Sequence, residues 1–151
     1  MKLEYIYTKN DVNSITEKLE VLRNSFYKTN GQISKIINKS LTLEEKEMLI
    51  EFSKSNGLNF DNVKDFSNII EGFIKYIANI PVLTLTVAFN PTYENTRNIA
   101  AEIKEIVGRE VIISFKTNPA IIGGAVLEYN GKYKSHTLID KVRGSQNQHS
   151  L

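Results

Sequence analysis

The stretch "TNPAIIGGAVLEYNGKYKSHTLID", residues 117–140, decides how the C-terminal half of this chain folds. Asn130-Gly131 separates two runs in which apolar and polar residues alternate. Two residues of this type between such runs are the strongest short-range signal for a β-hairpin. We therefore predict strands over 125–129 and 132–136. Almost no side chain in the stretch is suited to catalysis, so its backbone geometry matters more than its reactivity.

Upstream of this hairpin the chain alternates between strand and helix patterns. Apolar residues recur at every second position over 83–89 and again over 111–115, which predicts two strands. Between them we expect a helix that Asn90-Pro91 opens, with the proline at its first position, and that Gly108 closes. The apolar stripe of this helix consists of Ile99, Ile103 and Ile106.

Residues 10–79 follow a helical period. The first helix, which closes near residue 30, has a stripe formed by Val12, Ile15, Leu19, Leu22 and Phe26. A short segment around residues 33–37 follows. Thr42 and Glu45 then have the spacing of a capping box, and Asn56-Gly57 supplies the stop signal.

The last helix of this half has the widest apolar face, and Pro81 ends it. This face consists of Val63, Phe66, Ile69, Ile70, Phe73, Ile74 and Ile77. Such a face is either the core of a small bundle or, in part, the lining of a groove for a partner's amphipathic helix. Residues 1–8 are either a short strand or a helix.

The change of period near residues 79–81 predicts an α+β protein with two domains. Residues 1–79 form a helical bundle, and residues 80–151 form a small β-α-β-β-β-α domain with a mixed sheet. The final helix of this order is short, from about Leu138 to Arg143.

The composition excludes several classes of site. There is no cysteine, which excludes disulfides and thiolate chemistry, and neither His136 nor His149 has a partner at metal-ligand spacing. Gly123-Gly124 lacks the Lys and Ser or Thr of a phosphate-binding loop, so the pair predicts a backbone turn or bulge. We expect no catalytic residue, no cofactor and no metal.

Charge and hydropathy narrow the choice of partners. The chain has 19 Lys and Arg against 17 Asp and Glu, a net charge of +2, which is too weak for a typical nucleic-acid surface. Glu44, Glu45, Glu47 and Glu51 are explained by a solvated helical face. No apolar run approaches the roughly 20 residues that span a bilayer.

The segment "NPAIIGGAVLEYNGKYKSHT" (118–137) resembles a segment of the F-type ATP synthase delta subunit, called oligomycin-sensitivity-conferring protein in mitochondria. The positions that fall on the family pattern are Pro119, Ile122, Gly123, Gly124, Val126 and Thr137. The likeness extends more weakly over residues 41–143. The chain departs from the pattern at Ser135-His136 and at 139–142, where the family has an Arg-Gly-Arg motif, and its helical half is shorter than usual.

The resemblance implies a non-catalytic connector of the peripheral stalk, or stator, of a proton-translocating ATP synthase. The helical domain would bind the N-terminal helices of the alpha subunits, and the C-terminal domain would hold the b subunits. The chain would then be peripheral to an energy-coupling membrane, on the side of the catalytic head, and would meet the membrane only through the complex.

We predict that the alpha subunits bind in a groove between the helices at 12–26 and 63–77. Its lining would be Ile15, Leu19, Leu22, Phe66, Ile70 and Phe73. Two other functions remain open from the sequence: a small RNA- or ribosome-associated α+β factor, and a protein–protein adaptor unrelated to ATP synthase.

Overall fold

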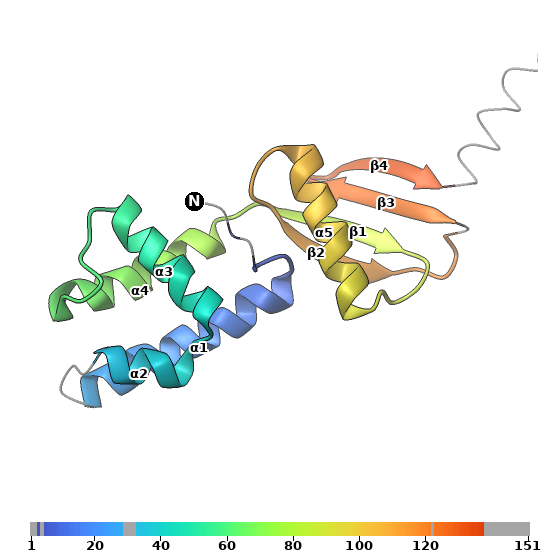
Figure 1. Ribbon diagram of the computed structural model, residues 1–151. Helices are drawn as coiled ribbons and strands as arrows, with labels where there is room; N and C mark the ends of the chain where they lie inside the picture. Colours follow the sequence, from blue (N-terminus) through green and yellow to red (C-terminus); the bar gives the residue numbers. More distant parts are fainter. Residues whose placement is uncertain (1–2, 4, 29–32, 122, 138–151) are drawn as a thin grey trace, which may run out of the picture. The chain divides into compact units, whose positions relative to one another are not determined.

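The computed structural model describes residues 3, 5–28, 33–121 and 123–137. These residues form five helices and one four-stranded sheet (Figure 1). The chain divides into two compact units, Met1–Ile80 and Pro81–Leu151. The first contains only helices and the second contains the sheet and one helix, which confirms the predicted α+β class with a mixed sheet.

The helical unit contains α1 (Lys9–Lys28), α2 (Ile33–Ser40), α3 (Leu43–Ser55) and α4 (Val63–Ala78). Its core contains most residues of the predicted stripes, but Val63 at the start of α4 is 51% exposed and lies outside it. α1 and α4 run in opposite directions (Figure 1), and the ring of Phe26, near the end of α1, lies 5.0 Å from that of Phe66, near the start of α4. Phe52 of α3 meets Phe73 of α4 edge to face at 5.4 Å.

The helix ends follow local sequence signals. Thr42 accepts a hydrogen bond from the Glu45 backbone N–H, and the Glu45 carboxylate accepts one from the Thr42 N–H, so the predicted capping box is confirmed. Asn56 ends α3, and Gly57 has a φ of 67°, as the predicted stop signal requires. The sequence analysis missed a cap at the start of α1, where the Asp11 carboxylate accepts from the Thr8 N–H and the Thr8 hydroxyl accepts from the Asp11 N–H.

The segment before α1 contributes to the interior. Leu3 and Ile6 are buried, whereas Tyr5 between them is exposed. The described residues of this segment belong to no helix, and Thr8 forms a single bridge. Residues 3 and 5–8 therefore form neither the helix nor the regular strand considered from the sequence.

The second unit contains β1 (Val82–Val87), α5 (Tyr93–Val107), β2 (Ile112–Thr117), β3 (Gly124–Tyr129) and β4 (Lys132–Thr137). The strand order is β2-β1-β3-β4. β1 pairs in parallel with β2 and antiparallel with β3, and β3 and β4 form an antiparallel hairpin. A parallel pair needs a long crossover, which α5 supplies. The predicted sheet is confirmed; the predicted helix at 138–143 lies outside the described residues.

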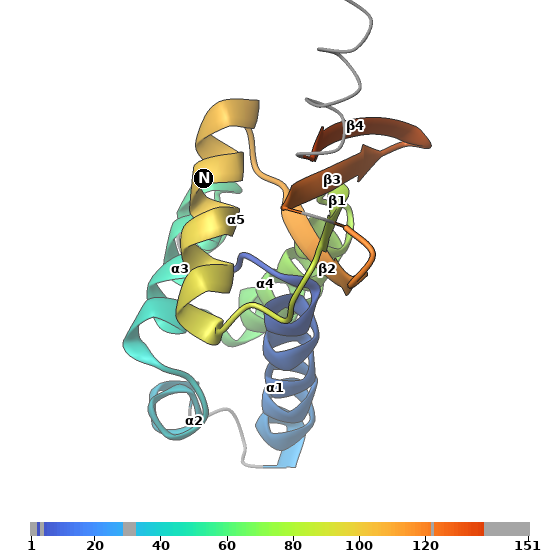
Figure 2. The ribbon, with the colours of Figure 1, turned by 90° about the vertical axis from the view of Figure 1, so that its right-hand side faces the viewer.

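α5 lies against one face of the sheet (Figures 1 and 2). Leu83, Leu85 and Val87 alternate with less buried residues along β1, so they share a face, and Ala100 of α5 is also buried. Leu85 pairs with Phe115 of β2 on one side. These apolar side chains form the core of the second unit.

Two details of α5 differ from the sequence prediction. The helix begins at Tyr93, and the Thr92 side chain caps it by accepting from the Asn95 N–H, so Pro91 precedes the cap and is not the first helical residue. Ile106 is 83% exposed and does not belong to the buried stripe, because the helix turns Ala100 toward the interior instead.

Candidate partner-binding surfaces

The six side chains predicted to line a groove come together between α1 and α4, but they are closed to solvent. None of them is more than 3% exposed. They are Ile15, Leu19, Leu22, Phe66, Ile70 and Phe73. They form the core of the helical unit, and a partner helix could contact them only after α1 and α4 separate. Their role in binding stays a prediction.

The helical unit has an open pocket elsewhere, which the sequence analysis did not find. It has a volume of about 620 Å³ and lies between α2, α3 and the loop that joins α3 to α4. Its lining residues are Ile37, Lys46, Ile50, Ser53, Lys54, Gly57, Leu58, Asn59, Phe60 and Asp61. The sequence signal was Leu58 and Phe60, two apolar side chains in a segment otherwise typical of a turn.

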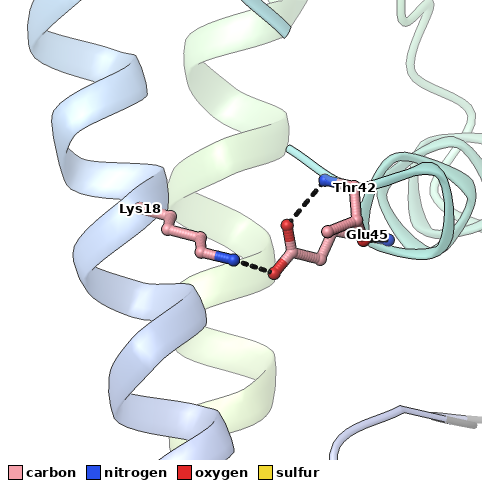
Figure 3. Close-up of polar contacts among 3 residues, drawn as sticks. All are labelled: Lys18, Thr42 and Glu45. Carbon is pink, nitrogen blue, oxygen red and sulfur yellow. Dashed lines mark hydrogen bonds and ion pairs between the residues drawn. The ribbon is translucent and has the colours of Figure 1, made fainter. Parts of the chain in front are cut away.

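The helix that forms one wall of this pocket is fixed at its start. Glu45 accepts a hydrogen bond from the Thr42 N–H through one oxygen, at 2.9 Å, and binds the Lys18 ammonium of α1 through the other, at 2.7 Å (Figure 3). One carboxylate therefore caps α3 and ties it to α1. This arrangement sets the position of α3 relative to the neighbouring helix.

The loop that forms the opposite wall is held by short-range hydrogen bonds. The Asp65 carboxylate accepts from the Asn59 N–H at 3.1 Å, and the Asn59 side chain accepts from the Asp61 N–H at 3.0 Å. Asn62 caps α4 by accepting from the Lys64 N–H. These bonds give a loop without regular structure a defined shape beside the pocket.

In the second unit, Asn118 and Pro119 build the turn before β3. Asn118 donates its N–H to the Val87 carbonyl at 2.8 Å, and its own side chain accepts from the Ala120 N–H at 3.0 Å. The Asn118 carbonyl accepts from the Ile121 N–H at 3.1 Å. Pro119 therefore lies inside a hydrogen-bonded turn, where its fixed φ is favourable.

The other family-motif positions that the structure describes lie in the β3–β4 hairpin or directly before it. Gly123 and Gly124 have φ values of 61° and 110°, which side chains rarely adopt. Val126 pairs with Thr86 of β1, and Thr137 pairs with Gly124 at the open end of the hairpin. Ile122 lies outside the described residues. The motif positions that the structure describes thus shape the backbone and present no reactive group.

The hairpin is also linked to the end of α5. Arg109 donates a hydrogen bond to the Tyr129 hydroxyl at 3.1 Å, and its guanidinium lies 5.4 Å from the centre of that ring. Lys104 and Glu110 form an ion pair of 2.9 Å in the same region. The Arg109–Tyr129 contact joins the end of α5 to β3, and the Lys104–Glu110 pair joins α5 to the segment that follows it.

Ionisable groups in the described ranges form ordinary surface interactions. No group of three or more His, Asp or Glu side chains that could hold a metal occurs among them. The pKa of Glu44 is lowered by hydrogen bonds to its own backbone and to Thr42, and the pKa of Glu71 is lowered mainly by its hydrogen bond to Lys75. Hydrogen bonds to a carboxylate favour its charged form, and neither shift indicates a reactive site.

Across the described part of the chain, no helix combines the length and apolar character needed to cross a bilayer. The comparison with curated proteins gives no match. The family model described as "ATP synthase delta (OSCP) subunit" matches residues 59–148, which is more than half of the chain. That family is a non-catalytic, peripheral stalk subunit of the F-type ATP synthase, and it associates with other subunits of the complex. The sequence motif, the two-unit fold and this match agree, and the chain belongs to the ATP synthase delta (OSCP) family.

Proposed function

We propose that this chain connects the catalytic head of a rotary ATP synthase to the b subunits of the peripheral stalk. The helical unit binds the N-terminal helices of the alpha subunits, and the sheet unit holds the b subunits. The connection keeps the head stationary while the rotor turns, so that proton-driven rotation is coupled to ATP synthesis. The protein is then peripheral to the membrane, on the side of the catalytic head.

The observation that carries this proposal is the family match, which covers α4 and all described residues of the sheet unit. The division into two units supports it, because a connector needs one surface for each partner. We treat residues 1–79 and 80–151 as separate binding domains on this ground. Two modest contacts on one chain reinforce each other by raising the effective concentration at the second site.

The proposal is tested by purifying the tagged full chain from its native source and identifying the chains that accompany it. We expect alpha, beta and b subunits. A second preparation, of a chain truncated after residue 80, should retain alpha and beta and lose b. Recovery of ribosomal proteins, or of no ATP synthase subunit, would overturn the proposal.

A further inference from the structure

We propose that Asn130, in the turn that joins β3 to β4 (Figure 1), is a modification site that deamidates spontaneously to isoaspartate and aspartate. The proposal does not depend on the proposed function. Asn-Gly pairs begin at residues 30, 56 and 130, and the structure describes the last two. These two pairs have opposite surroundings, and the difference selects the one that reacts.

The reaction needs only the side-chain amide, the backbone nitrogen of the next residue and water. The Gly131 nitrogen loses its proton to hydroxide and attacks the side-chain carbonyl carbon of Asn130. The new C–N bond closes a five-membered succinimide, the bond from that carbon to Nδ2 breaks, and ammonia leaves with a proton taken from water. Water then opens the ring at either carbonyl and gives aspartate or isoaspartate. Glycine obstructs the attack least, because it has no Cβ.

The turn leaves both reacting groups accessible. Asn130 and Gly131 are exposed, and their φ values of 49° and 74° are those of a two-residue hairpin turn of type I′. The β3–β4 ladder closes at the pair Tyr129 and Lys132, so the Gly131 N–H lies outside it. The Asn130 side chain forms no hydrogen bond with another residue of the described ranges. Solvent therefore reaches the amide and the nucleophile.

The hairpin tip also opens at low cost. Ring closure needs an open turn, because a succinimide excludes the left-handed helical backbone of the asparagine in a type I′ turn. The rate therefore follows how often each Asn-Gly pair opens, and exposed loop tips open most readily. Opening here breaks the Tyr129–Lys132 pair at the end of the ladder and relieves the positive φ of Asn130.

Asn56 is the protected counterpart, because it caps the C-terminus of α3. Its Nδ2 donates to the Phe52 carbonyl at 2.8 Å, and its backbone N–H donates to the same carbonyl at 3.2 Å. The Gly57 N–H, which would supply the nucleophile, donates to the Lys54 carbonyl at 3.2 Å. These hydrogen bonds have to break before Asn56 reacts, so we expect it to deamidate at least about ten-fold more slowly than Asn130.

The products change the hairpin. Isoaspartate adds a methylene group to the main chain, so the turn no longer has the geometry that fixes the register of Tyr129 against Lys132. Both products add a negative charge at the tip. The hairpin pairs Val126 with Ser135 and Gly124 with Thr137, so deamidation loosens the element that carries these motif positions.

The test incubates the full chain at mildly alkaline pH and physiological temperature over several weeks, folded and in concentrated urea. Tryptic peptides are then analysed by mass spectrometry with fragmentation that distinguishes isoaspartate from aspartate. The peptide 117–132 contains Asn130 and an internal control, Asn118. The residue after Asn118 is Pro119, whose nitrogen has no proton to lose, so Asn118 cannot follow this route. Asn56 lies in the separate peptide 55–64.

In the folded chain we expect Asn130 to deamidate at least about ten-fold faster than Asn56, with isoaspartate among the products and Asn118 unchanged. In urea the two Asn-Gly pairs should react at rates within about three-fold of each other, because the difference comes from the fold. Equal rates at Asn56 and Asn130 in the folded chain would overturn the assignment. So would an intact Asn130 in the folded chain beside a deamidated one in urea.

Asn130→Gly tests the effect on the hairpin, because it removes the reacting amide and glycine adopts the same positive φ. The melting temperature of the parent chain should fall during the incubation, in step with the conversion of Asn130. The variant should lose less. An equal fall in both chains would show that deamidation at this turn does not loosen the hairpin.

Discussion

The Lys18 ammonium lies 2.7 Å from the Glu45 carboxylate, so the middle of α1 is joined to the first turn of α3 (Figure 3). Glu45 is largely covered, with a side chain 14% exposed, whereas Lys18 is 40% exposed. The same carboxylate closes the capping box with Thr42. Glu45 therefore has two structural roles, and a substitution of Lys18 removes the ion pair while it leaves the cap in place.

We predict that Glu45→Ala destabilises the protein by about 1–2 kcal/mol, because it removes both the cap and the ion pair. Lys18→Met removes only the ion pair and should cost about 0.5 kcal/mol, since one partner is substantially solvated. A double-mutant cycle measured by urea unfolding gives their coupling, which should lie between about 0.3 and 1 kcal/mol. A coupling of zero would mean that the ion pair does not help to position α3.

Phe73→Ala tests whether the predicted groove residues are core. Phe73 is fully buried and meets Phe52 edge to face, so its truncation should cost about 3–5 kcal/mol in the free energy of unfolding. Val21→Ala on α1 is the control, because Val21 is 61% exposed, and it should change stability by less than about 0.5 kcal/mol. A loss below about 1 kcal/mol at Phe73, with weaker partner binding, would instead support an open groove.

The helices and strands followed from the sequence because their signals are local. The period of two along β1, the Asn130-Gly131 turn and the Thr42–Glu45 capping box each fix a short stretch regardless of the rest of the chain. Where the prediction was wrong, two signals competed. Pro91 suits a first helical position, yet Thr92 offers a side-chain cap one residue later, and the cap determines where α5 begins.

The candidate site was harder to predict because it depends on how the helices pack. An apolar face such as that of α4 has the same pattern whether neighbours or a partner cover it. The structure covers it with α1 and α3 and leaves a pocket beside α3, which Ile50 lines together with Leu58 and Phe60 from a loop. No periodicity links a helix to a loop, so the apolar residues Leu58 and Phe60 did not by themselves indicate that a pocket forms against α3.

Gly131→Ala tests the hairpin turn of the sheet unit. Gly131 has a φ of 74°, and an added Cβ would meet nothing within 4 Å, so the cost is purely conformational. We expect a loss of about 1–2 kcal/mol in the free energy of unfolding. Asn130→Gly is the control, because Asn130 already has a φ of 49° and glycine adopts it freely. An unchanged stability in Gly131→Ala would show that the turn adopts another type.

The Glu71–Lys75 pair on α4 predicts a pH dependence with a definite sign. The hydrogen bond and charge of Lys75, at 2.7 Å, hold the pKa of the Glu71 carboxyl below its ordinary value of 4.5. Because the Glu71 pKa is lower in the folded state than in the unfolded state, ionised Glu71 stabilises the folded state above pH 4.5. This stabilisation is lost as the pH falls through the folded-state pKa. Lys75→Met should therefore raise the Glu71 pKa, as followed by carboxyl NMR titration, and should destabilise the protein at pH 7 more than at pH 3.

Lys64→Met serves as the control on the same helix. A Glu71 pKa that does not move in Lys75→Met would show that the pair does not persist in solution.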